Sequence, residues 1–459
     1  MGRVVVKFGG SNLKSAGDIA RLIAAVEAYD RPLVIVVSAL YGVTDILKET
    51  VDGVIEDKNL IFRLKNWLLE EHKKILFSYI NHTIIRQECL FTIRNRLDEL
   101  EKFLFGIHLL QEVPPAAEDR VLSYGERLSS LLLTAILNYK DIECREALPE
   151  DIGLCTDGIH GNATVDYQKS RERLERCLKP DSTYIVPGFY GIGDHGKVTL
   201  LGRGGSDYSA AAIGLCLGAE SVDVWKDVEG FMSADPKKIG EARAIESLSY
   251  LEAAELSYFG AGILHPRTFE PLMEADIPVK LYNITGFSGE LAPVSIVSGR
   301  KKPTDNIVKS VTWTDDVGIM QLKGSGVGIK PGIMAKVAGQ LNTCRINIKS
   351  ILTAQTAINI LLSRKDTVRA ATVIQENGIA AVEDVECIGN ISLVAVVGDG
   401  ILDRPGIAAR VFGAVSRQHI NIRIICFGAS DVAAYFIIPC DDCIEAARAI
   451  HQEFFNENN

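Results

Sequence analysis

The sequence predicts an α/β fold in which a mostly parallel sheet sandwiched by helices is followed by two small βαββαβ domains. Apolar runs at 4–8 and 33–37 alternate with helical patterns, which is typical of a parallel sheet covered on both faces. A stretch rich in Leu, Lys and Glu at about 50–112 has no glycine between Gly53 and Gly106, which favours a helical insertion. Short words in the last third recur 74 residues later, which indicates a duplicated unit.

Length and charge bound the class of protein. A chain of 459 residues is too long for one hydrophobic core, so roughly two to four domains are expected. The formal net charge of −10 argues against nucleic acid as the main partner. No apolar run reaches the roughly 18 residues that a membrane span needs, and the N-terminus lacks the pattern of a signal peptide. We therefore expect a cytoplasmic protein that binds neither nucleic acid nor membranes.

The ten cysteines include one Cys-x-x-Cys pair, Cys440 and Cys443. A zinc site of this type needs a second pair or two nearby histidines, and the sequence offers neither. We therefore expect reduced thiols, and no metal site built from protein side chains.

The predicted sheet elements follow one another along the chain. The strand at 4–8 ends at Gly9 and Gly10, and a helix is expected from about 16 to 28 before the strand at 33–37. Because ligands bind at the carboxyl ends of parallel strands, the turns that follow these strands are candidate sites. Further strands are expected at 183–187, 197–201, 222–225 and 277–282.

Two apparent nucleotide motifs at 191–197 are interpreted as a hairpin turn. Gly191, Gly193 and Gly196 match a dinucleotide fingerprint by letters, but no helix follows Gly196. The same segment nearly spells a phosphate-binding loop, but Val198 stands where Ser or Thr would hold Mg²⁺.

The C-terminal third is predicted to be duplicated. The word Pro-Gly-Ile at 331–333 returns at 405–407, and Ile-Asn-Ile at 346–348 returns at 420–422. Each copy is predicted to run strand, Pro-Gly turn, helix, two strands and helix, as in a βαββαβ unit. A polar linker at 298–305 precedes the two predicted domains, 306–385 and 386–459. A ligand site at the interfaces of these small sheets is expected.

The segment at 201–208, Leu-Gly-Arg-Gly-Gly-Ser-Asp-Tyr, is the most informative motif. Its glycines allow close approach to a ligand, and the alanine-rich helix that follows offers N–H groups to an anion. Arg203 can hold a carboxylate or phosphate through two parallel hydrogen bonds. The segment predicts a site for an acidic small molecule and a phosphate together.

Other candidates end the first two strands or begin a helix. Lys7 at the end of a buried strand is costly unless it meets an anion, and with the following glycines it suits a transferring phosphoryl group. Ser38 and Thr44 can donate hydrogen bonds to a substrate. Glu126, in a helical first turn, either favours the helix dipole or receives a substrate ammonium.

These motifs, taken in order, resemble those of aspartate kinases, members of the amino-acid kinase superfamily. The repeated tail resembles the paired ACT domains of that family, and the resemblance covers nearly the whole chain. The further motifs that carry it are Gly-Glu-Arg-Leu-Ser at 125–129, Asp-Val-Trp-Lys-Asp-Val-Glu-Gly at 223–230, Ala-Asp-Pro at 234–236 and Leu-His-Pro at 264–266.

The resemblance implies an amino-acid kinase fold at 1–298 and phosphorylation of the L-aspartate β-carboxylate by MgATP. The product, 4-phospho-L-aspartate, opens the route to lysine, threonine and methionine. The resemblance also implies allosteric control by an amino-acid effector at the ACT domains, and a homodimer or homotetramer. A carboxylate is already a nucleophile at neutral pH, so no general base is needed.

The resemblance assigns residues to each role. Lys7 and Asp207 are the expected catalytic pair. The expected nucleotide site comprises Lys7, Gly9, Gly10, Ser11, Lys226, Asp227, Phe231 and Lys237. The expected acceptor site comprises Ser38, Thr44, Glu126, Arg203, Gly204 and Ser206. The expected regulatory site comprises Gly332, Ile333, Met334, Ala335, Lys349, Thr353 and Gln355.

The sequence departs from the family in the regulatory loop and near the phosphate site. Lysine-sensitive relatives carry acidic residues where Lys349 and Gln355 stand here, so strong inhibition by lysine is not expected. Gly262 stands where some relatives place a lysine near the phosphates, and Arg267 is a candidate to supply that charge.

Two alternatives stay open: a kinase of another acceptor (glutamate, N-acetylglutamate or UMP), and a catalytically weakened amino-acid sensor.

Overall fold

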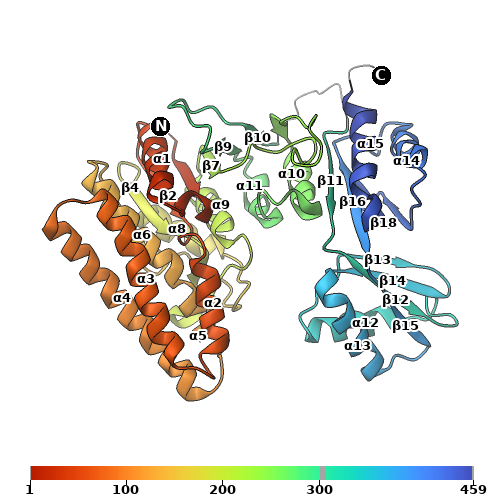
Figure 1. Cartoon of the computed structure of the whole chain (residues 1–459), viewed down its shortest axis with the longest axis horizontal. Coiled ribbons are helices and arrows are strands. Elements are labelled where there is room, and N and C mark those ends of the chain that lie inside the picture. Colours follow the sequence, from red (N-terminus) through yellow and green to blue (C-terminus); the bar gives the residue numbers. More distant parts are fainter. Residues whose placement is uncertain (1, 300–306, 457–459) are drawn as a thin grey trace. The chain divides into compact units, whose positions relative to one another are not determined.

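The computed structural model describes residues 2–299 and 307–456 as two compact units (Figure 1). The first unit holds residues 2–231, 244–257 and 262–299. The second holds 307–456 together with two short excursions of the chain, 232–243 and 258–261. The predicted catalytic domain at 1–298 is therefore interrupted twice. Most of the predicted linker, and the predicted boundaries at 306 and 459, lie outside the described residues.

An eight-stranded sheet forms the centre of the first unit. Its strand order is β3-β4-β2-β1-β7-β9-β10-β8, and every neighbouring pair is parallel except β9 with β10. The predicted mostly parallel sheet is thus confirmed. The strands are β1 (Val4–Phe8), β2 (Leu33–Val37), β3 (Cys144–Glu146), β4 (Thr183–Pro187), β7 (Ser221–Lys226), β8 (Ser247–Leu248), β9 (Val279–Asn283) and β10 (Ser295–Val297).

Helices cover both faces of this sheet. α9 (Gly205–Leu217) is buried at all but one of its positions, and α6 (Tyr124–Tyr139) contributes to the core that includes β1 and β2. The long helices α3 (Asn59–Tyr79) and α4 (Thr83–Leu110) lie side by side (Figure 1), where the glycine-poor stretch predicted helix. The other helices are α1 (Ala16–Glu27), α2 (Val43–Gly53), α5 (Pro115–Leu122), α7 (Pro149–Ile152), α8 (Tyr167–Cys177), α10 (Tyr250–Leu256) and α11 (Glu270–Met273).

Side-chain alternation along β1 decides which face Lys7 reaches. Val4, Val6 and Phe8 belong to the core shared with α1 and α6. Successive side chains of a strand point to opposite faces, so Lys7 points to the other face. Its salt bridge to Asp207 shows that α9 covers that face. The predicted turn after β5 (Tyr190–Ile192) leads into its antiparallel partner β6 (Val198–Leu200), which confirms a hairpin rather than a nucleotide loop.

The second unit contains two antiparallel four-stranded sheets, each packed against two helices (Figure 1). One has the order β13-β14-β12-β15 and carries α12 (Ile333–Thr343) and α13 (Thr367–Asn377). The other has the order β11-β16-β18-β17 and carries α14 (Ile407–Arg417) and α15 (Cys443–Phe455). The strands are β11 (Ser310–Thr314), β12 (Gly318–Lys323), β13 (Ser350–Thr353), β14 (Ala357–Leu362), β15 (Asp384–Ile388), β16 (Ile391–Val397), β17 (Ile424–Phe427) and β18 (Ala433–Pro439).

The two copies close their sheets in different ways. β12 to β15 run through one continuous βαββαβ unit, as the repeat predicted. The second copy supplies only βαββα after residue 390, and its fourth strand is β11, which precedes the first copy and pairs with β16. The strands therefore do not divide at 385/386 as predicted. The Ile-Asn-Ile words are not strands themselves but lead into β13 and β17.

The excursion at 232–243 is built into the second unit. Its Ser233 carbonyl accepts from the Val311 amide at 2.8 Å, and its hydroxyl meets Nε2 of the buried His451 at 2.9 Å. Ala234 and Ile239 join the apolar core of that unit.

No helix within 2–299 or 307–456 combines the length and apolarity needed to cross a membrane.

Candidate active site

A cavity of about 350 Å³ opens at the carboxyl edge of the large sheet. β1, β2 and β4 are parallel neighbours, so the segments that follow them meet at this edge. The N-terminal turns of α6 and α9 complete the wall. The lining residues are Lys7, Gly10, Ser38, Ala39, Leu40, Tyr41, Gly42, Thr44, Asp45, Glu126, Phe189, Gly204, Gly205, Ser206 and Asp207.

Two lysines share one buried carboxylate at the bottom of this site. Lys7 and Asp207, which are 4% and 5% exposed, form a salt bridge. Nζ of the half-buried Lys226 lies 3.2 Å from the other oxygen of Asp207. Burial opposes the charge of Asp207, but Lys226 and Lys7 outweigh it and hold the pKa of Asp207 below its ordinary value. Two ammonium groups against one carboxylate leave one net positive charge, which suits a phosphoryl group.

The segment after β1 is a single 3₁₀ turn, Gly10–Leu13, and the helix predicted from about residue 16 begins at Ala16, as expected. The buried Asn12 fixes this turn, because its side-chain amide donates to the Trp225 carbonyl at 2.7 Å. A Cβ on Gly10 would lie 3.2 Å from the Ala39 carbonyl oxygen. The turn thus packs close to the end of β2 and leaves its backbone at the cavity.

The carboxyl group of Glu126 is buried in the wall of the cavity. It is 3% exposed, and its Oε2 has no hydrogen-bond partner within the described chain. Burial raises the pKa of Glu126 to about 8, although the Ala39 amide and Lys7 act in the opposite direction. α6 can approach the end of β2 because residue 125 is glycine, whose Cβ would lie 2.7 Å from that of Ala39. A buried acid of this kind calls for a cationic ligand.

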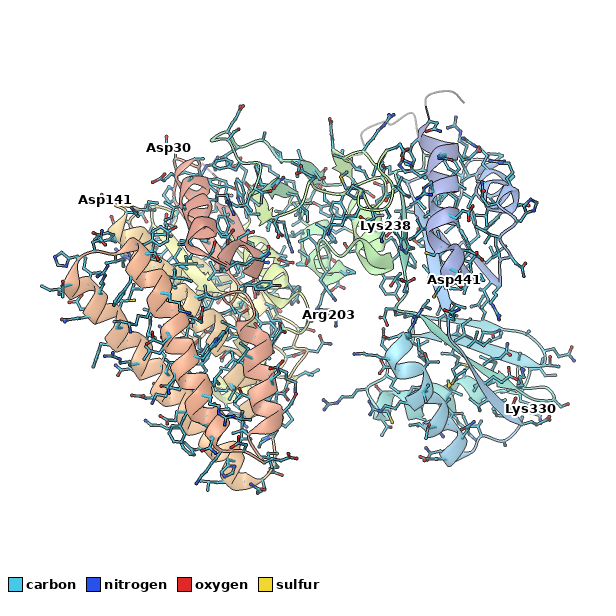
Figure 2. The ribbon with its side chains drawn as sticks, in the orientation of Figure 1. Asp30, Asp141, Arg203, Lys238, Lys330 and Asp441 are labelled. Atoms are coloured by element: carbon cyan, nitrogen blue, oxygen red, sulfur yellow. The ribbon has the colours of Figure 1, made fainter. Side chains whose placement is uncertain are left out.

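The turn that carries Arg203 directly precedes the N-terminus of α9. Gly202 and Gly204 on either side have φ of 79° and 69°, the left-handed region that favours glycine. Arg203 is exposed (Figure 2), and no carboxylate within the described ranges pairs with its guanidinium. Ser206 and Asp207 follow in the first turn of α9. The turn therefore brings a free cation, a hydroxyl and backbone N–H groups to one place.

The structure places three further predicted nucleotide-site residues in different surroundings. Asp227 is exposed and lies 3.3 Å from Nζ of Lys14. Phe231 is wholly buried, and its amide donates to the Ser295 hydroxyl at 3.0 Å, so its side chain does not reach a ligand surface. Lys237 is exposed and falls in the excursion that belongs to the second unit. Phe231 therefore stays a predicted nucleotide-site residue, with its side chain in the core.

The expectation that Arg267 supplies charge to the phosphates is also wrong. Its guanidinium donates to four oxygen acceptors within the first unit, so its hydrogen-bonding capacity is largely used.

Phe189, which lines the cavity with φ of 74°, is not predicted by any sequence pattern. A bulky residue in the left-handed region is uncommon and is held there by its surroundings. Its amide donates to Ser209 at 3.0 Å, and its carbonyl accepts from the Leu201 amide at 2.8 Å. Asn12 was likewise missed, since only the fold shows that it bonds to β7 across the chain.

Four of the predicted regulatory residues, Gly332 to Ala335, form the start of α12, and the others lie on or beside β13. Gly332 has φ of 84° and precedes the buried Ile333 and half-buried Met334, whereas Ala335 is exposed. Thr353 ends β13, and the Gln355 carbonyl accepts from the Gly328 amide at 3.2 Å.

Lys349 forms a salt bridge with Asp316. Its ammonium donates to the Asp316 carbonyl and lies 3.2 Å from Oδ2 of that residue. Asp316 also accepts from the Arg364 amide at 3.0 Å. Although burial opposes it, this set of donors keeps the pKa of Asp316 below its ordinary value.

The cysteines remain free thiols in the structure. Burial raises the pKa of Cys443 to about 12, and Nη2 of Arg364 lies 3.0 Å from the sulfur of Cys440. Across the described residues, no group of three or more His, Cys, Asp or Glu side chains is placed to hold a metal ion.

Comparison with known proteins places both units. The family model described as amino acid kinase family matches residues 2–283, and an ACT domain model matches residues 394–454. The lysine-sensitive aspartokinase 3 of Escherichia coli is 28% identical over 98% of this chain and 99% of its own length. A crystal structure of E. coli aspartokinase III with aspartate and ADP has a TM-score of 0.83 at 28% identity, covering 99% of this chain and 100% of that one.

A bifunctional aspartokinase/homoserine dehydrogenase 2 of Arabidopsis thaliana is 28% identical over 98% of this chain. The chain spans 50% of that relative's length, about half of the bifunctional protein. The amino acid kinase model covers more than half of this chain, and it includes the buried Lys7–Asp207 pair and the Arg203 turn. The chain therefore belongs to the amino acid kinase family.

Proposed function

We propose that this protein transfers the γ-phosphoryl group of ATP to the β-carboxylate of L-aspartate, forming 4-phospho-L-aspartate. One observation carries the proposal. A single cavity is lined by Lys7 and Asp207, which form a cluster of net positive charge with Lys226, and by Glu126, a buried acid whose Oε2 has no partner within the described chain. The first suits a transferring phosphoryl group, and the second suits the ammonium of an amino acid.

The lysine cluster would act on the phosphoryl group. Asp207 engages one hydrogen-bonding direction of each ammonium, which leaves further donors of Lys7 and Lys226 for phosphate oxygens. Gly9, Gly10 and Ser11 would surround the phosphates with backbone N–H groups. Mg²⁺ bound to the nucleotide phosphates would supply further charge neutralisation. Because the acceptor carboxylate is already ionised, positioning and electrostatic stabilisation suffice for the transfer.

The acceptor would lie between Glu126 and the Arg203 turn. Glu126 would pair with the ammonium of aspartate, and Arg203 would hold a carboxylate in a bidentate manner. Ser38, Thr44 and Ser206 would donate hydrogen bonds from the wall. The names of the relatives, which are aspartokinases, and the E. coli structure with aspartate and ADP support this acceptor and this nucleotide.

The second unit would carry the control of this reaction. Its two sheets provide the framework for an amino-acid effector, and the segment 232–243, which contains the proposed nucleotide residue Lys237, is packed into it. We propose that the protein works as a homodimer or homotetramer in the cytoplasm, in the supply of lysine, threonine and methionine.

The test is an acceptor panel with two readouts. Purified protein with MgATP is given L-aspartate, L-glutamate or N-acetylglutamate, and ADP release is measured together with hydroxamate formation from trapped acyl phosphate. We expect equal amounts of ADP and hydroxamate with aspartate, and neither from the Lys7→Met variant. Turnover with another acceptor alone would refute the proposed substrate. No turnover at all, with amino-acid binding seen by calorimetry, would favour the sensor.

A further inference from the structure

Arg267 joins three segments of the first unit that are distant in sequence. It belongs to a 3₁₀ turn, Pro266–Thr268. Its Nη1 donates to the Leu201 carbonyl at 3.0 Å and to Oδ1 of Asn162 at 3.1 Å. Its Nη2 donates to the Ala163 carbonyl at 2.7 Å and to the Thr164 hydroxyl at 2.8 Å. The guanidinium also stacks over the Tyr208 ring, 4.2 Å from its centre.

The acceptor turn at 201–205 is enclosed by the segments that Arg267 connects. A Cβ on Gly202 would lie 2.6 Å from Oδ1 of Asn162, so the turn abuts the 161–164 loop. A Cβ on Gly204 would lie 2.3 Å from Cβ of His265, so the turn also abuts the start of the Arg267 segment. The turn is thus held from two sides, and Arg267 bonds to one side from the other.

Arg203 depends on this support because, among the described residues, no carboxylate fixes its guanidinium. It is exposed and has no ion pair inside the described part of the chain, so its placement follows the backbone between Gly202 and Gly204. Leu201, whose carbonyl accepts from Arg267, begins that turn, and Tyr208, under the guanidinium, lies one turn into α9. Arg267 therefore grips both ends of the segment that carries Arg203 and Ser206.

We propose that Arg267 is a positioning residue for acceptor binding: it locks the 201–205 turn so that Arg203 meets the acceptor carboxylate. This inference rests on the proposed function of the cavity. The four acceptors require a planar fork, which Arg provides and Lys does not. The charge of Arg267 is secondary, because two of the acceptors are main-chain carbonyls and two are neutral side chains.

The first experiment compares the kinetics of Arg267→Lys and Arg267→Gln with a matched control. We expect the KM for L-aspartate to rise about 10- to 100-fold in both variants, since small misplacements of a binding group are costly. The KM for ATP should stay within about twofold, because Asp207, although it follows the turn, is also held by its salt bridges to Lys7 and Lys226. The control is Arg31→Gln, which loses guanidinium bonds to the Gly2 carbonyl and Glu220 elsewhere in the unit. Equal effects on both substrates, or no effect on either, would overturn the proposal.

A double-mutant cycle asks whether Arg267 acts through Arg203. In an Arg203→Ala background, the further change Arg267→Gln should alter the KM for aspartate by less than about twofold, since coupled residues are not additive. Full additivity would show that Arg267 acts by another route and would overturn the inference.

Hydrogen exchange separates this inference from the proposed function. The amides of Leu201, Gly205 and Tyr208 are bonded within or next to the turn. They should exchange faster in Arg267→Lys than in the wild type, with no nucleotide or acceptor present. Faster exchange in a protein that phosphorylates no acceptor would support the clamp and refute the kinase. Unchanged exchange in an active, folded variant would refute the clamp alone, and a thermal melt of each variant identifies misfolding.

Discussion

The phosphoryl end and the acceptor end of the proposed site differ in how their charged groups are paired. At the phosphoryl end, Asp207 is bonded by Lys7 on one oxygen and Lys226 on the other, so the charged groups are arranged before any ligand arrives. At the acceptor end, Glu126 keeps a buried oxygen without a partner, and Arg203 has no ion pair within the described chain. The charged groups of the phosphoryl end are already paired, whereas those of the acceptor end would be paired only by a ligand.

The difference follows from what each end has to do. Stabilising a transition state favours groups that need no rearrangement when charge develops. Recognising a substrate favours groups whose desolvation is compensated only by the correct partner, because the wrong ligand leaves them unpaired. Paired charges therefore mark the chemistry, and unpaired charges mark specificity.

Breaking the paired end should have the largest effect. In Asp207→Asn the two lysines lose their shared counter-charge, so they repel each other and move from the phosphate position. We expect kcat to fall about 10³-fold, as for other preorganised charge stabilisers, while the KM for aspartate changes by less than about tenfold. Steady-state assays measure both constants. Asp52→Asn, which removes an exposed partner of Lys48, is the control. A kcat within tenfold of the wild type would contradict the role given to Asp207.

Changing the unpaired end should act on binding and on its pH dependence. Because burial raises the pKa of Glu126 to about 8, much of the free protein carries a protonated Glu126 at pH 7. An acceptor ammonium needs the ionised form, so the KM for aspartate should fall as pH rises from about 6.5 to 8, by up to about tenfold per unit. In Glu126→Gln the KM should be high and nearly independent of pH over this range. A parallel pH profile in the variant would assign the titration to another group.

The same shift has a signature in stability without any ligand. The pKa of Glu126 is raised on folding, so the folded chain binds a proton that the unfolded chain has released between about pH 4.5 and 8. The contribution of this group to stability is present below pH 4.5 and is lost as pH rises toward 8. The wild type should therefore lose stability relative to Glu126→Gln across that window in chemical unfolding. A constant difference would contradict the raised pKa.

The contrast between the two ends also explains what sequence could and could not predict. Lys7, Asp207, Glu126 and the Arg203 turn were found because each follows a strand or begins a helix, and parallel strands end at one edge. The same pattern does not say which way a side chain points, so it does not predict that Phe231 is wholly buried.

Other failures concern partners far along the chain. The sequence suggests Arg267 as a source of charge for the phosphates because its residue type carries a positive charge. Its four hydrogen-bond acceptors lie more than 60 residues away along the chain, so the sequence does not reveal them. β11 was assigned to the nearer repeat although it pairs with β16. The fold class and the repeat rest on local periodicity and were predictable, whereas the exchange of a strand and the clamp on a turn depend on tertiary contacts.

The second unit offers a further case of a charge that is already paired. Lys349 stands on the loop before β13, where a lysine effector would need acceptors for its ammonium. Its own ammonium instead occupies the Asp316 carbonyl and carboxylate. Asp316 is also engaged by Ser363 and the Arg364 amide. By the rule drawn from the cavity, a completed pair leaves no demand for a cationic ligand.

We therefore expect the smallest effect in the last test, which is inhibition by L-lysine. Over 1 to 10 mM lysine, roughly the affinity range of weak metabolite sites, wild-type activity should change by less than about twofold. Lys349→Ala removes the competing ammonium and frees Oδ2 of Asp316, so calorimetry should detect tighter lysine binding to this variant than to the wild type. Lys323→Ala, which removes the lysine of another ion pair in the same sheet, that with Glu386, is the matched control. Complete inhibition of the wild type at 1 mM would show that lysine finds acceptors other than Asp316, because Lys349 already holds that carboxylate.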